Sequence, residues 1–307
     1  MSLTIIGSMA FDAIETPFAK TERTVGGSGT YCAYAATNFM HAVNQVSIVG
    51  GDFPKEVLKD LNRLGVNTEG VEIVEDKKSF FWSGKYHLDM NTRETLITDL
   101  NVLADFNPIL PESYQQTDYL LLGNLVPAIQ RSVIQQLTKR PKLIVLDTMN
   151  FWMETAMADL KDVLKMVDVL VVNDSEARQL ADEFSIVKAA HKILAMGPKF
   201  LIVKKGEHGA LLFNGDEIFC APALPLEDVF DPTGAGDAFA GGFIGYLAST
   251  GDLSFENMKT AVIMGSATAS FCCEKLGTER LQTLTQQEID NRAAKFVALT
   301  NFNLTCK

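Results

Sequence analysis

The sequence lacks the long apolar runs that a membrane protein or a secreted precursor would need. Its 307 residues contain no uninterrupted apolar stretch of about 18 residues, so we expect no membrane-spanning helix. Residues 1–7 show no charged segment followed by a long apolar one, so we expect no secretory signal. Together these two absences predict a cytoplasmic protein.

Cysteine and histidine are scarce, with five and four copies. An odd number of cysteines, none of them in C-x-x-C spacing, is atypical of a disulfide framework, a zinc site or a redox site. The histidines show no spacing typical of a metal site. We interpret the cysteines as reduced thiols of a folded core. They are Cys32, Cys220, Cys272, Cys273 and Cys306.

Basic residues are outnumbered. The chain has 27 Lys and Arg against 38 Asp and Glu, which gives a formal net charge of -11. A chain with this charge repels phosphate backbones and anionic lipid, so we expect no nucleic-acid or membrane partner. A small phosphorylated ligand stays compatible, because backbone N–H groups bind anions without any lysine.

Three familiar nucleotide-binding signatures are missing. The sequence has no G-x-x-x-x-G-K-[ST], which excludes a P-loop, and no G-x-G-x-x-G after its first apolar segment, which argues against a dinucleotide site. The signature set of protein kinases is absent too. Any nucleotide chemistry must therefore use another kind of loop.

What the sequence does contain is a regular alternation of short apolar runs with helical segments. This pattern predicts an α/β fold with three layers, in which helices cover both faces of a mostly parallel central sheet. We expect one domain over residues 1–307. The expected strands are 3–7, 46–49, 119–122, 143–146, 169–172 and 200–203, followed by a hairpin at 210–213 and 217–220. The expected helices are 31–40, 55–64, 130–137, 156–167, 175–184, 235–249, 255–273 and 286–296.

Residues 71–98 break this alternation. Polar and apolar residues alternate there around a turn near Asp89, which predicts a small, half-exposed antiparallel excursion. We expect a β-lid formed by insertions at about 11–26 and 76–101. Phe80 and Trp82 would share one face of a lid strand, with Phe81 on the other. These aromatic rings either cover a nucleobase or pack on the lid's own core or on a second subunit.

One glycine-rich loop can carry phosphate chemistry. Residues 231–237 read DPTGAGD and precede an apolar helical segment. Gly234 and Gly236 can adopt backbone angles closed to other residues, so N–H groups would point outward at a helix start and form an anion hole. Such a hole stabilises a phosphoryl group during transfer. Asp237 could take the proton of an attacking hydroxyl, although the residues alone also fit a helix cap and a turn.

The stretch 231–243, DPTGAGDAFAGGF, closely resembles the C-terminal signature of the PfkB (ribokinase-like) family of carbohydrate and nucleoside kinases. The order of the other segments resembles that family over nearly the whole chain. The resemblance implies a ribokinase-like fold. It also implies that Asp237 is the catalytic base, that Asp231 lies beside the phosphates, and that the anion hole consists of the amides of Gly234, Ala235 and Gly236.

Two further segments resemble the family's ATP site. Residues 173–176, NDSE, resemble its N-x-x-E motif, which implies that Asn173 and Glu176 help to place magnesium, with Glu176 acting through water. A helix cap is the alternative from the residues alone. The segment 205–209, KGEHG, resembles the glycine turn beside the ATP phosphates, with a plain hairpin turn as the alternative. This likeness implies roles for Lys205, Gly206 and Gly209.

The N-terminal segments resemble the family's acceptor site. Residues 7–12, GSMAFD, resemble the first-strand segment, which implies that Asp12 binds substrate hydroxyls. Residues 26–31, GGSGTY, resemble the glycine signature whose backbone approaches the substrate. The acceptor site implied by the resemblance consists of Asp12, Gly26, Gly27, Ser28 and Asn124.

The chain departs from the family pattern at three positions. Ala10 and Tyr31 stand where many members have asparagine, and Trp152 stands near a frequent arginine. The resemblance therefore carries over to Asp147, beside the phosphate path, only weakly.

The resemblance implies a kinase that uses ATP and Mg²⁺ to phosphorylate the hydroxymethyl group of a sugar or a nucleoside, and a monovalent cation is a further candidate cofactor. Two alternatives stay open. One is a non-catalytic sensor that binds a sugar or nucleotide in the same pocket, and the other is an assembly role in which the lid is mainly a homodimer interface.

Overall fold

The central element of the protein is a large, mostly parallel sheet. The computed structural model describes residues 1–215 and 217–301, so Cys306 lies outside the described residues. Within this part, nine strands form one sheet in the order β13-β12-β11-β10-β9-β8-β1-β4-β5. Every neighbouring pair from β5 to β11 is parallel, and β12 and β13 continue antiparallel. The strands are β1 (Leu3–Ile6), β4 (Val43–Gly50), β5 (Val66–Val74), β8 (Tyr119–Leu122), β9 (Leu143–Asp147), β10 (Val169–Asn173), β11 (Phe200–Lys204), β12 (Ala210–Asn214) and β13 (Glu217–Ala221).

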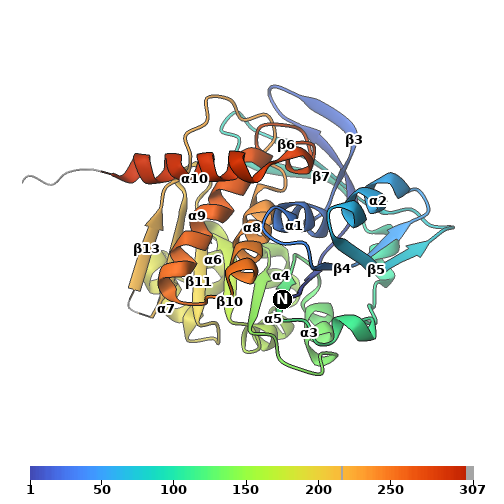
Figure 1. Cartoon of the computed structure of the whole chain (residues 1–307), viewed down its shortest axis with the longest axis horizontal. Helices are drawn as coiled ribbons and strands as arrows, with labels where there is room; N and C mark the ends of the chain where they lie inside the picture. Colours follow the sequence, from blue (N-terminus) through green and yellow to red (C-terminus); the bar gives the residue numbers. More distant parts are fainter. Residues whose placement is uncertain (216, 302–307) are drawn as a thin grey trace, which may run out of the picture.

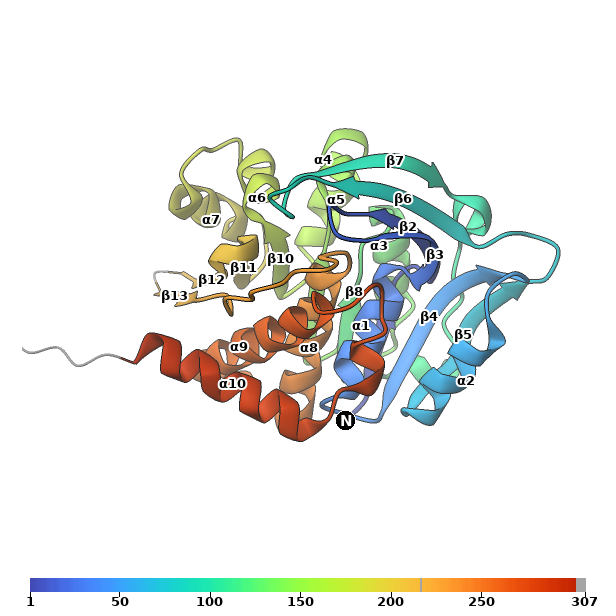
Figure 2. The same ribbon diagram turned by 90° about the horizontal axis from the view of Figure 1, so that it is seen from above.

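Helices cover both faces of this sheet (Figures 1 and 2). The strands are buried on both sides, and their alternating side chains divide the core into two halves. Leu3 and Ile5 face one half, and Ile6 faces the other. The first half is covered by α1 (Ser28–Thr37), α2 (Lys55–Arg63), α8 (Ala235–Thr250) and α9 (Phe255–Cys272), with α10 (Gln286–Thr300) packed on α9. The second is covered by α3 (Pro127–Gln135), α4 (Asn150–Thr155), α5 (Met157–Leu164), α6 (Asp174–Ala181) and α7 (Ile186–Leu194).

Helices α1 and α8 approach each other very closely. A methyl group added at Gly241 would collide with the backbone of Cys32, and one added at Gly245 would lie 2.9 Å from the Cα of Ala36. Small residues on both helices therefore set the distance between them. This contact brings the N-terminal ends of the two helices together.

A second sheet of four strands has the order β3-β2-β6-β7. It consists of β2 (Ala10–Glu15), β3 (Lys20–Gly26), β6 (Phe80–Tyr86) and β7 (Arg93–Asp99), which come from the two expected insertions. The turn between β6 and β7 reaches toward the main body of the protein (Figure 2). There the Asn91 side chain would collide with a methyl group added at Gly206.

Several sequence-based expectations about elements were wrong in detail. Residues 71–74 belong to β5 in the main sheet, so the excursion begins later than residue 71. The expected helix 156–167 is confirmed as α5, which ends at Leu164, but the short helix α4 that precedes it was not predicted. Helix α7 was not predicted. Cys32, Cys220, Cys272 and Cys273 are free thiols as expected, but Cys220 is exposed rather than in the core. Among the described residues, no helix is both long and apolar enough to cross a bilayer.

Candidate active site

The candidate site lies where the strand order of the main sheet reverses. Strand β1 sits between β4 on one side and β8 on the other, and ligands of such sheets bind at the carboxyl ends of the strands beside this reversal. Polar side chains end three neighbouring strands at that edge. They are Asp147 at the end of β9, Asn173 at the end of β10 and Lys204 at the end of β11.

The glycine-rich loop leads into helix α8 at the same edge. Gly234 precedes the helix with a φ of 75°, a left-handed conformation that favours glycine. A methyl group at Gly234 would overlap the ring of Tyr31 in α1. The close packing of α1 on α8 thus positions the loop. Asp237 lies in the first turn of α8 and is partly exposed.

The three amides expected to form an anion hole are not equivalent. The Ala235 N–H is donated to the carbonyl of Pro232 at 3.1 Å. Among the described residues, the N–H groups of Gly234 and Gly236 have no acceptor. A methyl group at Gly236 would lie 2.8 Å from Nζ of Lys204, so the ammonium group borders this amide. The free N–H groups and the positive end of α8 point to one place.

The Asp237 carboxyl lies in an electrostatic environment that favours proton exchange near neutrality. Burial raises its pKa to about 7, and the negative charge of Asp147 acts in the same direction. Lys204 and Arg93 oppose the shift. A carboxylate with this pKa is a stronger base than an exposed aspartate.

Sequence reasoning missed Lys204 and chose Lys205 instead. Lys204 is two residues beyond Ile202, which faces the core half under α8, and strand alternation directs both side chains toward that helix. Its Nζ lies 3.3 Å from Oδ2 of Asp147. Burial alone would lower its pKa, but Asp147, Glu176 and Asp237 together raise it, so the ammonium stays charged. Lys205 does not line the cavity described below.

Asp231, expected beside the phosphates, is wholly buried and holds the loop instead. One carboxylate oxygen accepts from the Thr233 N–H at 2.8 Å, and the other accepts from the Gly277 N–H at 2.9 Å. Burial raises its pKa. It therefore positions the glycine loop without facing the cavity.

Asn173 and Glu176 form a complete capping box at the start of α6. The Asn173 side chain accepts from the Glu176 N–H at 2.8 Å, and Oε2 of Glu176 accepts from the Asn173 N–H at 2.7 Å. Burial raises the pKa of Glu176 to about 7, against the effect of Lys204. The cap occupies Oε2 and leaves Oε1 available for another partner.

Of the residues expected to bind the acceptor, Asp12 and Gly26 lie in contact, and Gly27 and Ser28 follow Gly26 in the chain. Burial raises the pKa of Asp12 to about 7, and Asp231 and Asp237 add to the shift. A methyl group at Gly26 would collide with the Asp12 carboxylate, and the backbone of Gly27 partly opposes the rise in the pKa of Asp12. The Ser28 hydroxyl lies 3.3 Å from the hydroxyl of Ser8.

Asn124 is held by the residue that departs from the family pattern. Its Oδ1 accepts from the Trp152 indole N–H at 2.8 Å, and its Nδ2 lies 3.0 Å from Sδ of Met149. The amide oxygen therefore has a protein partner already. This arrangement orients Asn124 but limits what it can offer to a substrate.

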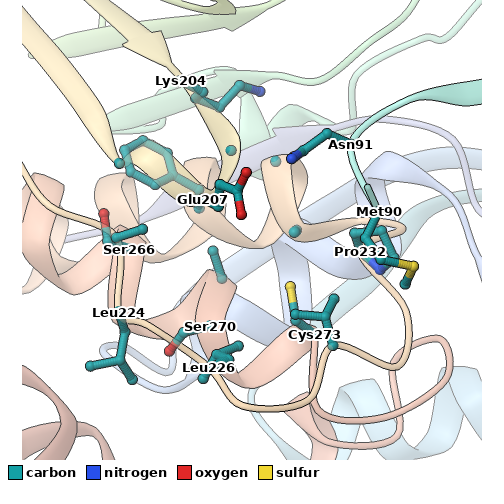
Figure 3. A pocket seen from close by; sticks show the side chains of 18 of the residues that line it. Met90, Asn91, Lys204, Glu207, Leu224, Leu226, Pro232, Ser266, Ser270 and Cys273 are labelled. Carbon is teal, nitrogen blue, oxygen red and sulfur yellow. The ribbon is translucent and has the colours of Figure 1, made fainter. Parts of the chain in front are cut away.

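A cavity of about 560 Å³ opens beside the start of α8 (Figure 3). Its polar end has Lys204, Asn173 and the amide of Gly236, and Gly206 and Gly209 also line the wall. The opposite end is apolar. Met90 and Asn91, from the β6–β7 turn, also line it and were not predicted. The apolar residues of the lining include Leu224, Pro225, Leu226, Val229, Phe239 and Ala269, and the lining also contains Ser266 and Ser270.

Comparison with known proteins shows the family of the chain. The fold and the site at the strand ends define a ribokinase-like α/β kinase. Residues 2–284 match the model of the pfkB family of carbohydrate kinases, and the chain belongs to that family. It is accordingly a phosphotransferase whose acceptor is an alcohol group.

Three similar proteins illustrate the range of this family. The cytidine kinase of Thermococcus kodakarensis is 28% identical over 80% of this chain and 87% of its own length. The nucleoside kinase of Burkholderia thailandensis, solved with inosine, has a TM-score of 0.76 at 23% identity and covers 97% and 98% of the two chains. An Escherichia coli protein solved with ATP and Mg²⁺ has a TM-score of 0.78 at 18% identity, covering 96% and 99%.

We expect Gly234→Ala to destabilise the protein by roughly 2–4 kcal/mol, because a left-handed alanine costs about 1 kcal/mol and a clash in a packed site adds about 1–3 kcal/mol. Gly215→Ala is a matched control, since Gly215 also has a positive φ of 56° but no atom within 4 Å of an added methyl group. Urea unfolding of both variants measures the difference. Equal costs at the two positions would refute the proposed contact between Gly234 and Tyr31.

Proposed function

We propose that the protein transfers the γ-phosphoryl group of ATP to the hydroxymethyl group of a sugar or nucleoside, with Asp237 as the general base. The observation that carries the proposal is the position of Asp237. It lies in the first turn of α8, next to Gly236 of the cavity lining, and its charge raises the pKa of Asp12. This position supports a carboxylate that acts between a nucleotide and an acceptor.

The proposed step involves one bond formed and one bond broken. The acceptor hydroxyl oxygen attacks the γ-phosphorus while its proton passes to Asp237, and the bond to the β-phosphate oxygen breaks to release ADP. The N–H groups of Gly234 and Gly236 and the ammonium of Lys204 stabilise the charge on the transferring group. Ala235 contributes its N–H only if the turn bond to Pro232 opens.

The cavity fits ATP in one orientation. Its apolar end suits the base, and its polar end at Lys204 and Gly236 suits the phosphates. The described residues contain no cluster of three or more His, Cys, Asp or Glu that could hold a metal. That agrees with magnesium held by phosphates, waters and Oε1 of Glu176, because Mg²⁺ keeps most of its water shell. When bound, Mg²⁺ would neutralise phosphate charge.

The second sheet supports the proposed lid. Its β6–β7 turn lies against Gly206 at the cavity wall, and its strand β2 carries Asp12. Ordering of this sheet over bound substrates would exclude water and limit hydrolysis of ATP.

The class of acceptor rests on Asp12 and its surroundings. A buried carboxylate can accept hydrogen bonds from adjacent hydroxyls of either a ribose-like sugar or a nucleoside. Similarity to a cytidine kinase and to a nucleoside kinase solved with inosine supports the nucleoside as strongly as the free sugar.

Asp237→Asn should lower kcat by on the order of 10²–10⁴-fold with little change in ATP binding, because the variant removes the base and keeps the shape. Coupled ADP release and equilibrium titration with ATP measure the two quantities. Asp290→Asn, at an exposed position on α10, is the control and should keep wild-type turnover. An Asp237→Asn enzyme with wild-type kcat would rule out the base assignment.

The rate should also depend on pH in the neutral range. The base must be deprotonated, and burial raises the pKa of Asp237 to about 7, so kcat/KM should rise with pH and level off above about 7. The charged groups around it are Asp147, Lys204 and Arg93. A pH profile at saturating MgATP tests this. A rate that stays constant down to about pH 5 would contradict a raised pKa.

Glu176→Gln separates the two roles of this residue. Glutamine at the third position of a helix still completes a capping box, so the free energy of unfolding should change by less than about 1 kcal/mol. The lost charge should raise the Mg²⁺ concentration needed for half-maximal activity by roughly 10-fold. Urea unfolding and a Mg²⁺ titration measure the two effects. Lost stability with an unchanged Mg²⁺ requirement would reduce Glu176 to a helix cap.

A further inference from the structure

An irregularity in the second sheet decides which way one arginine points. Along β6 and β7, Ser83 pairs with Ile97, but the next pair is Gly84 with Thr95. Leu96 is therefore an extra residue, a β-bulge in β7. Without it, Tyr86 would pair with Glu94, and Arg93 would point to the opposite face of the sheet.

With the bulge, Arg93 shares a face with residues of the candidate site. Residues directly opposite each other in neighbouring strands project to the same side. Asp12 pairs with Trp82, and Tyr86 pairs with Arg93, while Trp82 and Tyr86 are four residues apart on β6. Asp12, Trp82, Tyr86 and Arg93 thus occupy one face of the sheet.

That face looks toward the glycine-rich loop. The Tyr86 hydroxyl lies 3.2 Å from Oγ1 of Thr233, the residue before Gly234. Thr233 in turn donates its N–H to Asp231. The contact joins β6 directly to the segment that presents the proposed anion hole.

Two aromatic side chains hold the Arg93 guanidinium. Its Cζ lies 5.0 Å from the centre of the Trp82 ring, a cation–π arrangement, and its charge opposes the burial that raises the pKa of the neighbouring Tyr86. The Trp82 indole donates to Oγ1 of Thr95 at 3.3 Å, which fixes the ring. Arg93 itself remains exposed, so its remaining N–H donors are available.

The site needs another positive charge. The candidate site contains the carboxyl groups of Asp12, Asp147, Glu176 and Asp237. The cavity beside it is also lined by Asp89 and Glu207, and among the described residues of that lining Lys204 is the one lysine or arginine. ATP adds further negative charge that Lys204 and one Mg²⁺ would share. Arg93 lowers the pKa of Asp12, Glu176 and Asp237, so its charge reaches all three groups.

We propose that Arg93 is a catalytic residue that the second sheet brings to the transferring phosphoryl group, with the Leu96 bulge aiming it and Trp82 and Tyr86 holding it. The inference rests on the proposed phosphotransfer. The planar guanidinium would donate to equatorial oxygens of the phosphoryl group, where charge is greatest as the bond to ADP breaks. The sheet then supplies part of the catalytic charge in addition to covering the site.

Arg93→Met and Arg93→Lys test the proposal. Lys85→Met is the matched control. Lys85 lies on β6 of the same sheet, and because it is next to Tyr86 in the strand its side chain points to the other face. There it forms an ion pair with Glu15 at 2.7 Å. The assay measures ADP release with whichever of ribose, cytidine and inosine supports the fastest wild-type rate. Thermal unfolding by circular dichroism checks that each variant is folded.

We expect Arg93→Met to lower kcat by on the order of 10²-fold with KM for the acceptor within about threefold of wild type. Arg93→Lys should recover part of the lost kcat, because an ammonium group keeps the positive charge but lacks the paired N–H donors of the planar guanidinium. Guanidinium ion should partly restore an Arg93→Ala enzyme, and Lys85→Met should match wild type. The acidic limb of the pH profile should move to higher pH in Arg93→Met, since a neighbouring positive charge is lost.

Three results would overturn the inference. A folded Arg93→Met enzyme with kcat within about twofold of wild type removes the catalytic role. A loss confined to KM for the acceptor makes Arg93 an acceptor-binding residue. An equal loss of kcat in Lys85→Met would show that the effect comes from the net positive charge of the second sheet and not from the position of Arg93. A wild-type enzyme with no acceptor-dependent ADP release would instead refute the proposed function itself.

Discussion

The ammonium of Lys204 is the charge on which the site depends. It lies at the end of β11, mostly buried, 3.3 Å from Asp147 and within the field of Glu176 and Asp237. Burying an acidic group without a partner costs several kcal/mol or drives its protonation. One lysine cannot neutralise three carboxyl groups, so part of the free-energy cost of burying them is not compensated. The remainder is visible as carboxyl pKa values near 7 in Asp237 and Glu176.

This imbalance connects the fold with the chemistry. The parallel sheet places the carboxyl ends of β9, β10 and β11 side by side. The polar residues that end these strands, Asp147, Asn173 and Lys204, therefore lie at one edge of the sheet. The small residues of α1 and α8 allow the helices to approach, and the start of α8 then faces the same cluster. The excess negative charge of such a site attracts cations, and its free N–H groups can bind a phosphoryl group.

The second sheet adds to the same balance. It contributes the buried carboxylate of Asp12 on one strand and the cation of Arg93 on another, both on the face that contacts the glycine loop. A sheet that closes over substrates would bring these opposite charges in together. Binding, water exclusion and charge compensation would then be parts of one movement.

The sequence predicted those features that are contiguous along the chain. The loop at 231–237, the pair Asn173 and Glu176, and the alternation of strands and helices are local patterns, and the α/β fold follows from them. Lys204 was not predicted, because the family resemblance of the glycine turn begins at Lys205. Strand alternation from Ile202 would have indicated Lys204. Arg93 could not be found, because its direction depends on a bulge that only strand pairing reveals.

The residues that were assigned too active a role show the converse limit. Asp231 and Ala235 belong to the motif, but Asp231 accepts from the N–H groups of Thr233 and Gly277, and Ala235 donates to Pro232. Asn124 is held by Trp152. A motif marks which residues act together. It does not distinguish those that face the ligand from those that hold the loop in shape, because that distinction depends on long-range packing.

The most direct test of the account is to identify the fate of the γ-phosphoryl group. The protein would be incubated with MgATP and either inosine, cytidine or ribose, and the phosphorus-containing products followed by ³¹P NMR. The account predicts a phosphomonoester of the acceptor that forms in equal amount with ADP for at least one of these compounds. Formation of inorganic phosphate alone, or no change in ATP although an acceptor binds, would contradict it.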